Sequence, residues 1–475
     1  MNPTLMEHPT RTIRTPARLT KLAAACLALL LILCALSRIP VHASEPAALH
    51  DRPPVQSFIW VGNGDRGFTD EELHYIAAHY SLVVFSKFHG KWNIETQNHD
   101  ARRLKELNPQ IKVFVYYSMS YRFKQDRFGT DTFQEKWVLH DSNSGAMVPF
   151  VKRPKRDSSR REPTQVGWVM DLGQKEYRDW ALGILAGWLA AAPYDGVAFD
   201  SVVPINMDPR HMRRQLEDVS LSREAVDAWN EGIKQMLTAA AHLGGRHREV
   251  IFNGIADKST FVNRNLDLLN YADTALNEEF CMATPHGERR QVLPRHALEE
   301  EIKLMMHTAG MGKQILEKTN YRSDKMLEHL RIDKSQLSRF CYGVFLMGYT
   351  PGRHFFKFGP GYDARDGELT ENASEVAIPL GAPVGSFESA DGVWVRRFEH
   401  GVVYVNPDRG PRKVTLDRAL VRMNGDMNRG SVARGSSVTV PARDALYFLD
   451  EGATAPQAAT DPCGAKRPGC MAASG

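Results

Sequence analysis

From position 57 onward, the sequence alternates short runs of β-branched and aromatic residues with segments of helical periodicity. This alternation is typical of a parallel sheet, because successive parallel strands need a crossover connection that is usually a helix. Eight such runs in about 300 residues favour a (β/α)₈ TIM barrel over an open doubly wound sheet. No Gly-x-Gly-x-x-Gly follows the first run, which weakens a dinucleotide-binding fold. The predicted strands are residues 57–62, 82–87, 112–118, 196–202, 249–254, 274–279, 314–319 and 342–348.

Helical periodicity fills the intervals between these strands. Thr69 and Glu72 have the spacing of an N-cap residue and its capping-box partner. Two connections, 119–166 and 203–221, are too long for simple turns, and in a barrel both would lie at the C-terminal rim that builds the substrate site. The predicted helices are residues 69–80, 100–107, 175–192, 222–243, 295–309 and 323–337.

The pattern changes beyond about Pro379, where runs with period-two alternation are separated by Gly, Asn and Pro. This pattern predicts a small antiparallel β domain. We therefore expect a catalytic barrel at 56–372, a C-terminal β-sandwich at 379–451 and a disordered Ala/Pro/Gly-rich tail at 452–475.

The N-terminus has the pattern of a secretory signal at 1–43, followed by a linker at 44–55. Basic residues precede an apolar stretch at 22–36 that is shorter than the ~20 residues of a membrane span, and Val41-His42-Ala43 is typical of a cleavage site. We expect an exported protein, periplasmic or extracellular, that contacts a membrane only through this segment if the segment is not cleaved. In an oxidising compartment Cys463 and Cys470 could pair.

Net charge and motif content argue against nucleic-acid binding and against a metal or cofactor site. The formal charge of +4 is too small to predict nucleic-acid binding. The basic stretch at 152–161 is either a solvated loop or a contact for an anionic polymer. No Cys-x-x-Cys or His-rich ligand cluster is present, so we expect no metal and no cofactor.

Two segments with the same spacing carry the candidate chemistry. In 195–200 and in 273–278 an Asp opens a short apolar run and a carboxylate, Asp200 or Glu278, closes it. Strand ends of a parallel barrel meet at one rim, so the two acids can share a cleft. One would donate a proton and the other would act as nucleophile or base, which is the pairing that cleaves a glycosidic bond.

Neighbouring side chains of a strand point to opposite faces, so at most one of Glu278 and Glu279 faces the cleft. The register with Asp200 selects Glu278, but Glu279 shares the face of the small residue Ala275 and stays open as the alternative. Sugars stack on aromatic rings and hydrogen-bond to polar groups. The expected substrate-binding residues are Trp60, Lys87, His89, Tyr116, Tyr117, Asp171, Asn253, Lys318, Tyr349 and Arg353.

The motifs Met170-Asp171-Leu172-Gly173 with Tyr177-Arg178-Asp179-Trp180, the segments 195–200 and 273–278, and the stretch 396–407 together resemble hypothetical glycoside-hydrolase-like family 15. They resemble more distantly glycoside hydrolase family 114, of the endo-α-1,4-polygalactosaminidase type. The resemblance covers about residues 57–449 and implies a barrel glycosidase with a C-terminal β domain, in which Asp200 and Glu278 match the catalytic acids.

These observations predict an exported glycoside hydrolase that acts on a bacterial polysaccharide or oligosaccharide, with Asp200 as nucleophile or base and Glu278 as general acid. The alternative is a non-catalytic carbohydrate-binding barrel that assists export of an exopolysaccharide. A metal-dependent deacetylase is disfavoured, because the sequence has no plausible His/Asp ligand cluster.

Overall fold

The computed structural model describes residues 55–453 apart from 65, 88, 125–131, 153–163, 203, 206–215, 217–218, 256–264, 284–289 and 425–426. The predicted signal segment, the tail with Cys463 and Cys470, and nearly all of the basic stretch lie outside the described residues. Within the described part of the chain, no helix is both long and apolar enough to cross a membrane.

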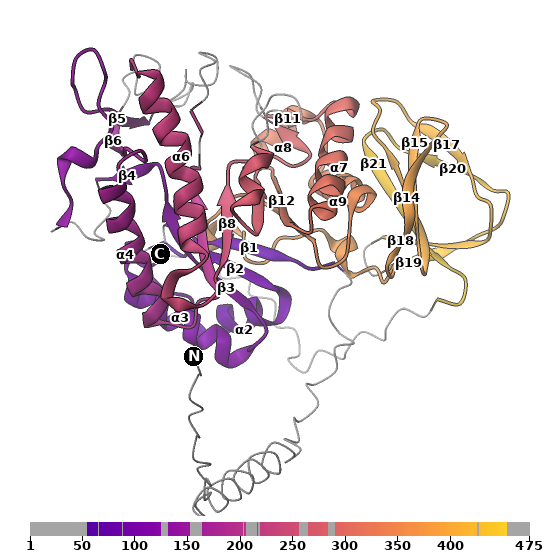
Figure 1. Cartoon of the computed structure of the whole chain (residues 1–475). Helices are drawn as coiled ribbons and strands as arrows, with labels where there is room; N and C mark the ends of the chain where they lie inside the picture. The colour runs from indigo at the N-terminus through magenta and orange to yellow at the C-terminus, as the bar shows by residue number, and fades with distance from the viewer. Residues whose placement is uncertain are drawn as a thin grey trace, which may run out of the picture. The chain divides into compact units, whose positions relative to one another are not determined.

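Eight parallel strands form a nearly closed barrel, which confirms the predicted fold class (Figure 1). Each strand pairs with its neighbours in the order of the chain, as expected when helices cross over between strands. In order around the sheet they are β1 (Phe58–Val61), β2 (Leu82–Phe85), β3 (Lys112–Ser118), β7 (Gly196–Asp200), β8 (Glu249–Asn253), β9 (Thr274–Asn277), β12 (Gln314–Asn320) and β13 (His354–Gly359).

The seam between β1 and β13 is held differently from the other strand pairs. It has isolated parallel bridges, Ser57 with Phe356 and Gly62 with Asp363. The segment that follows β13 adds a hydrogen bond at this seam. The Asn372 side-chain amide donates to Ser57 Oγ at 2.9 Å. The barrel is thus closed partly by side chains and by the segment after its last strand.

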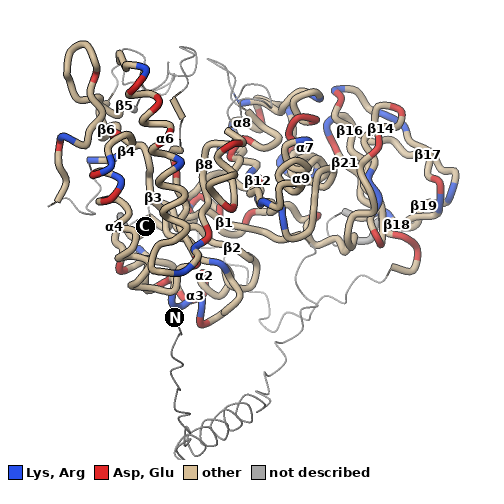
Figure 2. Tube along the Cα trace, in the orientation of Figure 1, with Lys and Arg blue, Asp and Glu red and all other residues tan. Residues whose placement is uncertain are grey.

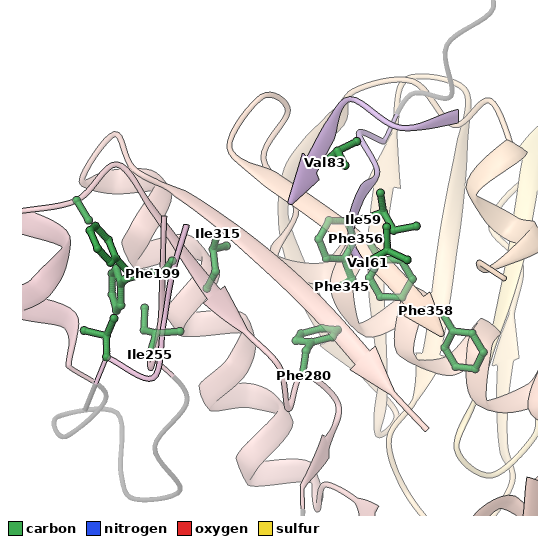
Figure 3. Close-up of a cluster of buried hydrophobic side chains, with 14 of the residues drawn as sticks. Ile59, Val61, Val83, Phe199, Ile255, Phe280, Ile315, Phe345, Phe356 and Phe358 are labelled. Carbon is green, nitrogen blue, oxygen red and sulfur yellow. The ribbon is translucent and has the colours of Figure 1, made fainter. Parts of the chain in front are cut away.

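The prediction of a strand at 342–348 is wrong. These residues form the C-terminal half of helix α9 (Lys334–Gly348), and β13 begins six residues later. One side of α9 faces the barrel, where Phe345 lies 5.1 Å from Phe356 between ring centroids (Figure 3). Another side meets the C-terminal sheet, where the Tyr447 hydroxyl donates to the Arg339 carbonyl at 2.6 Å. A helix buried on several sides is apolar all round and has no amphipathic period to distinguish it from a strand.

The other helices follow the prediction more closely. Thr69 and Glu72 form the predicted capping box, in which Glu72 N donates to Thr69 Oγ1 at 3.2 Å and Thr69 N donates to Glu72 Oε2 at 2.7 Å. The helix predicted at 323–337 is instead divided between α8 and α9. The helices preceding α9 are α2 (Asp70–His79), α3 (Ile94–Leu107), α4 (Lys175–Ala191), α6 (Arg223–Ala240), α7 (Arg295–Gly310) and α8 (Asp324–Leu330).

The long connection after β3 contains a three-stranded antiparallel sheet of β4 (Tyr121–Phe123), β6 (Thr164–Val169) and β5 (Pro149–Lys152), in that spatial order. A second small antiparallel pair, β10 (Met282–Ala283) and β11 (Gln291–Val292), follows β9. Both additions follow C-terminal ends of barrel strands, where insertions shape a binding site.

The C-terminal part is a separate antiparallel sheet, as predicted. Val402 and Tyr404 face a small core that includes residues of a two-stranded ribbon, whereas Val403 and Val405 belong to the large core with α9. The sheet order is β14 (Pro383–Ala390), β15 (Val393–Phe398), β16 (Gly401–Asn406), β21 (Asp444–Asp450), β18 (Leu420–Asn424) and β19 (Met427–Val432), and the ribbon is β17 (Arg412–Thr415) with β20 (Ser437–Val440).

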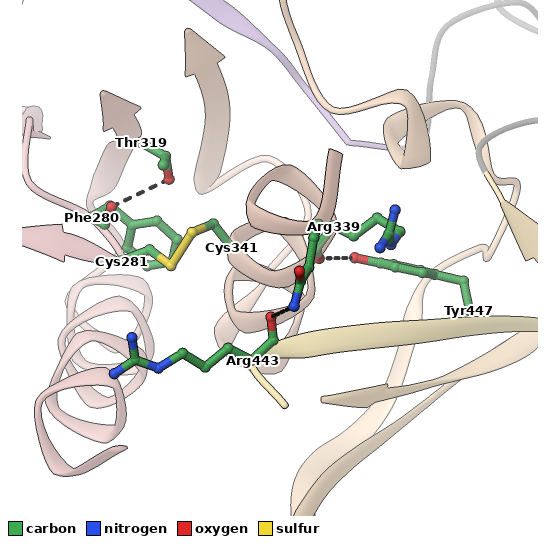
Figure 4. Close-up of a disulfide and its surroundings, with 8 residues drawn as sticks. Phe280, Cys281, Thr319, Arg339, Cys341, Arg443 and Tyr447 are labelled. Atoms are coloured by element: carbon green, nitrogen blue, oxygen red, sulfur yellow. Dashed lines mark hydrogen bonds between the residues drawn. A yellow bond between two sulfur atoms is a disulfide. The ribbon is translucent and has the colours of Figure 1, made fainter. Parts of the chain in front are cut away.

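A disulfide joins Cys281, just after β9, to Cys341 of α9, 60 residues further along the chain (Figure 4). Both residues are fully buried. This pairing could not be predicted from the sequence, because connectivity between distant cysteines cannot be read from spacing. The bond ties the loop that follows Glu278 to α9.

Positive and negative side chains are interspersed along the described trace (Figure 2). This mixture agrees with the small net charge of +4. It gives no reason to expect a polyanion-binding stripe on the described residues.

Candidate active site

The inside of the barrel is defined by a layer of side chains that alternate along each strand. Ala198 of β7 and Leu276 of β9 belong to this layer. Asp200 ends β7 two residues after Ala198, and Glu278 lies two residues after Leu276, one residue beyond the end of β9. Both lie on the inner side at the C-terminal rim, because Asp200 contacts Tyr116 of this layer and Glu278 contacts Tyr362, which packs on it. The layer consists of Phe58, Trp60, Leu82, Val84, Phe114, Tyr116, Ala198, Ile251, Leu276, Leu316 and Phe355.

Three donors surround the Asp200 carboxylate. The Tyr116 hydroxyl donates to Oδ2 at 2.8 Å, and the Asn253 side-chain amide donates to Oδ1 at 2.9 Å. The backbone N–H of Ser201 also donates to Oδ1, at 2.8 Å. Ser201 has φ of 58°, a left-handed conformation that is rare for a residue other than glycine. These donors hold the carboxylate in one orientation, as a nucleophile or base requires.

Glu278 is in a different environment. Burial raises the pKa of its carboxyl, and the negative charge of Asp200 raises it further. Hydrogen bonds from Tyr362 and Asn253 and the charge of Lys318 oppose this rise without cancelling it. The Tyr362 hydroxyl donates to Glu278 Oε1. A carboxyl that keeps its proton at higher pH is suited to general-acid chemistry.

The two acids therefore share one site at the rim of the barrel. The side chain of Asn253, on the strand between them, hydrogen-bonds to both carboxylates. The Tyr116 hydroxyl, which bonds to Asp200, also lies within the electrostatic range of Glu278. A buried carboxyl with a raised pKa beside a second carboxylate can protonate a leaving group while the second group attacks or activates water at the same bond.

Glu279 lies two residues beyond the end of β9, where it forms an isolated bridge with Thr319. Its Oε1 accepts from Arg290 at 3.4 Å, and its backbone N–H donates to the side chain of Asn277 at 3.2 Å. Asn277 in turn donates to Glu301 of α7 at 2.6 Å, outside the barrel. The structure thus favours Glu278 over Glu279 as the acid of the cleft.

The aspartates that open the two similar segments are structural. Asp195 Oδ2 accepts from the backbone N–H of Val113 at 2.7 Å, and Asp273 Oδ2 accepts from that of Val250 at 2.9 Å. Each therefore fixes the start of a neighbouring strand. The shared spacing therefore puts an aspartate that binds backbone N–H at the N-terminal end of each strand. It puts a carboxylate, Asp200 or Glu278, at the C-terminal end.

Lys318 is fully buried beside the site and does not line it as a substrate contact. Its Nζ donates to Glu368 Oε1 at 2.5 Å, and both side chains are fully buried. Lys357 lies 3.9 Å from the same carboxylate, and burial lowers the pKa of Lys357 to about 8. Tyr362 and Glu368, which the sequence analysis missed, both come from the segment after β13.

Some of the expected binding residues lie next to the site. Trp60 is buried in the barrel layer, where it packs edge-on against Tyr116 with ring centroids 6.1 Å apart. Lys87 and Tyr117 line a pocket that also includes Tyr116 and two tryptophans of α4, with about 460 Å³ of empty space partly open to solvent. Lys87 lies 4.6 Å from the centroid of the Phe123 ring in this neighbourhood.

The structure places two of the expected binding residues elsewhere, in structural roles near helices. His89 is fully buried, bonds through Nε2 to Asp100 at 2.7 Å and stacks on Phe85 at 4.9 Å. Asp171 accepts bonds from Gly173 N and the Gln174 side chain, both at 3.0 Å, and so shapes the turn before α4.

Tyr349 and Arg353 were misplaced because the eighth strand was assigned to the wrong segment. Tyr349 follows α9 and packs on Phe345, with ring centroids 5.4 Å apart. Arg353 precedes β13 at the N-terminal end of the barrel and donates to the Gly312 carbonyl at 2.6 Å. The same error concealed Tyr362, which follows the C-terminal end of the true strand.

Comparisons with known proteins bear on this site. A family described as hypothetical glycosyl hydrolase family 15 matches residues 105–402. No curated protein matches the chain.

Similar solved structures include an α-amylase from Geobacillus thermoleovorans complexed with acarbose (11% identity, 84% of this chain and 99% of that chain, TM-score 0.48). Another is the glycoside hydrolase domain of PelA from Pseudomonas aeruginosa (15% identity, 66% of this chain and 99% of that chain, TM-score 0.40). A third is the maltogenic α-amylase AmyB from Thermotoga neapolitana (12% identity, 83% and 97%, TM-score 0.47).

Proposed function

The chain belongs to hypothetical glycosyl hydrolase family 15, and from this premise we propose that it is an exported enzyme that hydrolyses O-glycosidic bonds of a bacterial polysaccharide. The observation that carries the proposal is the contact of Asn253 with both Asp200 and Glu278. Two carboxyl groups in one contact network, with different environments, are the minimum equipment for this reaction.

Glu278 acts as general acid. It transfers its proton to the glycosidic oxygen while the bond between that oxygen and the anomeric carbon breaks. Burial and the neighbouring Asp200 raise the pKa of Glu278, which keeps this proton available at higher pH. Asp200, held by Tyr116, Asn253 and Ser201, faces the positive charge that develops on the sugar ring, as nucleophile or as the base for water.

Export is supported by the sequence of residues 1–43 and by the disulfide between Cys281 and Cys341. Disulfides persist in oxidising compartments and are rare in the reducing cytosol. An exported glycosidase meets its substrate outside the cytoplasm, so we propose an extracytoplasmic polysaccharide as the substrate class.

The experiment incubates the purified mature protein with a panel of purified bacterial exopolysaccharides and measures new reducing ends. We expect the wild-type protein and Glu279→Gln to release reducing ends, and Asp200→Asn to lose about 10²- to 10⁴-fold in rate. Tight glycan binding without release of reducing ends from any member of the panel would instead support the carbohydrate-binding alternative.

A further inference from the structure

We propose that the segment that closes the barrel, residues 360–372, also completes the catalytic site, with Tyr362 as the positioning residue that holds the Glu278 carboxyl and with the Lys318–Glu368 pair as the support for Tyr362. This inference rests on the proposed function for the role of Glu278 as acid. The placement of the carboxyl itself can be tested without a substrate.

The closing segment fixes the backbone of Tyr362 against β1. Gly62 N donates to the Tyr362 carbonyl at 2.9 Å, and Ala364 N donates to the Gly62 carbonyl at 2.9 Å. Further along the segment, the Tyr80 hydroxyl donates to the Leu369 carbonyl at 2.7 Å. The same contacts that close the seam therefore set where the Tyr362 side chain begins.

The side chain of Tyr362 is held at both its ring and its hydroxyl. The ring packs against the apolar layer inside the barrel and lies 4.5 Å from Lys318 Nζ. Lys318 is fixed by Glu368, whose other carboxylate oxygen accepts from Gly361 N at 3.0 Å. Glu368 thus connects the lysine on β12 to the backbone next to Tyr362.

The Tyr362 hydroxyl points towards Glu278 and donates to its Oε1. Burial raises the pKa of Tyr362 well above its ordinary value, so the group stays protonated and acts as a donor. Such a donor favours the ionised form of Glu278 and limits the rise of its pKa. The titratable or charged groups that act on or contact Glu278 from the surrounding elements are Asp200, Tyr116, Lys318, Tyr362 and Arg290.

The test uses the mature chain carrying ¹³C-labelled glutamate side chains, with Glu278→Gln to identify the Glu278 resonance. Tyr362→Phe removes the donor, so the apparent pKa of Glu278 should rise by about one pH unit. Tyr321→Phe is the matched control, because the Tyr321 hydroxyl donates to Glu371 Oε2 at 2.7 Å and so loses an equivalent bond to the same segment. The control should leave the Glu278 titration unchanged.

No shift in Tyr362→Phe, or equal shifts in both variants, would overturn the proposal. If Tyr362→Phe does not fold, Tyr362→Met also lacks the donor and takes its place. On a substrate that the wild type cleaves, Tyr362→Phe should lower kcat with little change in KM and move the basic limb of the pH profile upward. If the pKa of Glu278 shifts in Tyr362→Phe but the wild-type protein hydrolyses no substrate, the positioning role of Tyr362 stands and the proposed function is rejected.

Discussion

Replacing Glu278 with Gln is expected to stabilise the protein while it removes activity. The repulsion between Asp200 and Glu278 acts in the folded state, and Asn253 interacts with both groups. Paired carboxyl groups of a glycosidase lie about 5 to 9.5 Å apart. At an effective dielectric constant of about 20, two charges at such a separation repel by roughly 2 to 3 kcal/mol. Lys318 and the donors to Glu278 offset part of this, which leaves a net gain of about 1 kcal/mol.

The pH dependence of this gain has a definite sign. The folded state raises the pKa of Glu278, so the penalty exists when the group is ionised and disappears as the pH falls below its ordinary value of 4.5. Glu278→Gln should therefore unfold at higher denaturant concentration than the wild type near pH 8, and the difference should vanish near pH 4. Urea titrations at several pH values measure it. A variant that is equally or less stable than the wild type at pH 8 would refute the reasoning.

Two further predictions concern other parts of the structure. Cys341→Ser removes a disulfide that closes a 60-residue separation, and should lower the free energy of unfolding by about 4 kcal/mol; a reductant should destabilise the wild type similarly and leave the variant unchanged. Tyr116→Phe removes a donor to Asp200 and should lower kcat about tenfold, with unchanged kcat as the contrary result.

The carboxylates at the strand ends could be proposed from the sequence because side chains alternate between the two faces of a strand. Ala198 and Leu276 point inward, and two residues later Asp200 contacts Tyr116 and Glu278 contacts Tyr362 on the same side. Glu278 keeps this direction although it lies one residue beyond the end of β9. The alternation of short strands with helices predicted the barrel, although one of its eight strands was assigned to the wrong segment. The catalytic role of the two acids stays a prediction.

What the sequence could not supply depends on contacts between distant segments. Helix α9 carries no period because the barrel and the C-terminal sheet both cover it. Tyr362 enters the site only because the chain after β13 turns back to β1, and nothing in its local sequence announces this. His89 looked like a rim residue, but Asp100 and two aromatic rings enclose it behind the strands.

The central claim is that Asp200 and Glu278 act on one bond, and a double-mutant cycle measures this directly. On the polysaccharide that the wild type cleaves, kcat/KM is determined for Asp200→Asn, Glu278→Gln and the double variant. Residues that act as a unit are strongly non-additive, so the double variant should lose about as much as the more damaged single variant. Losses that simply add, or a double variant that hydrolyses at the wild-type rate, would contradict the account.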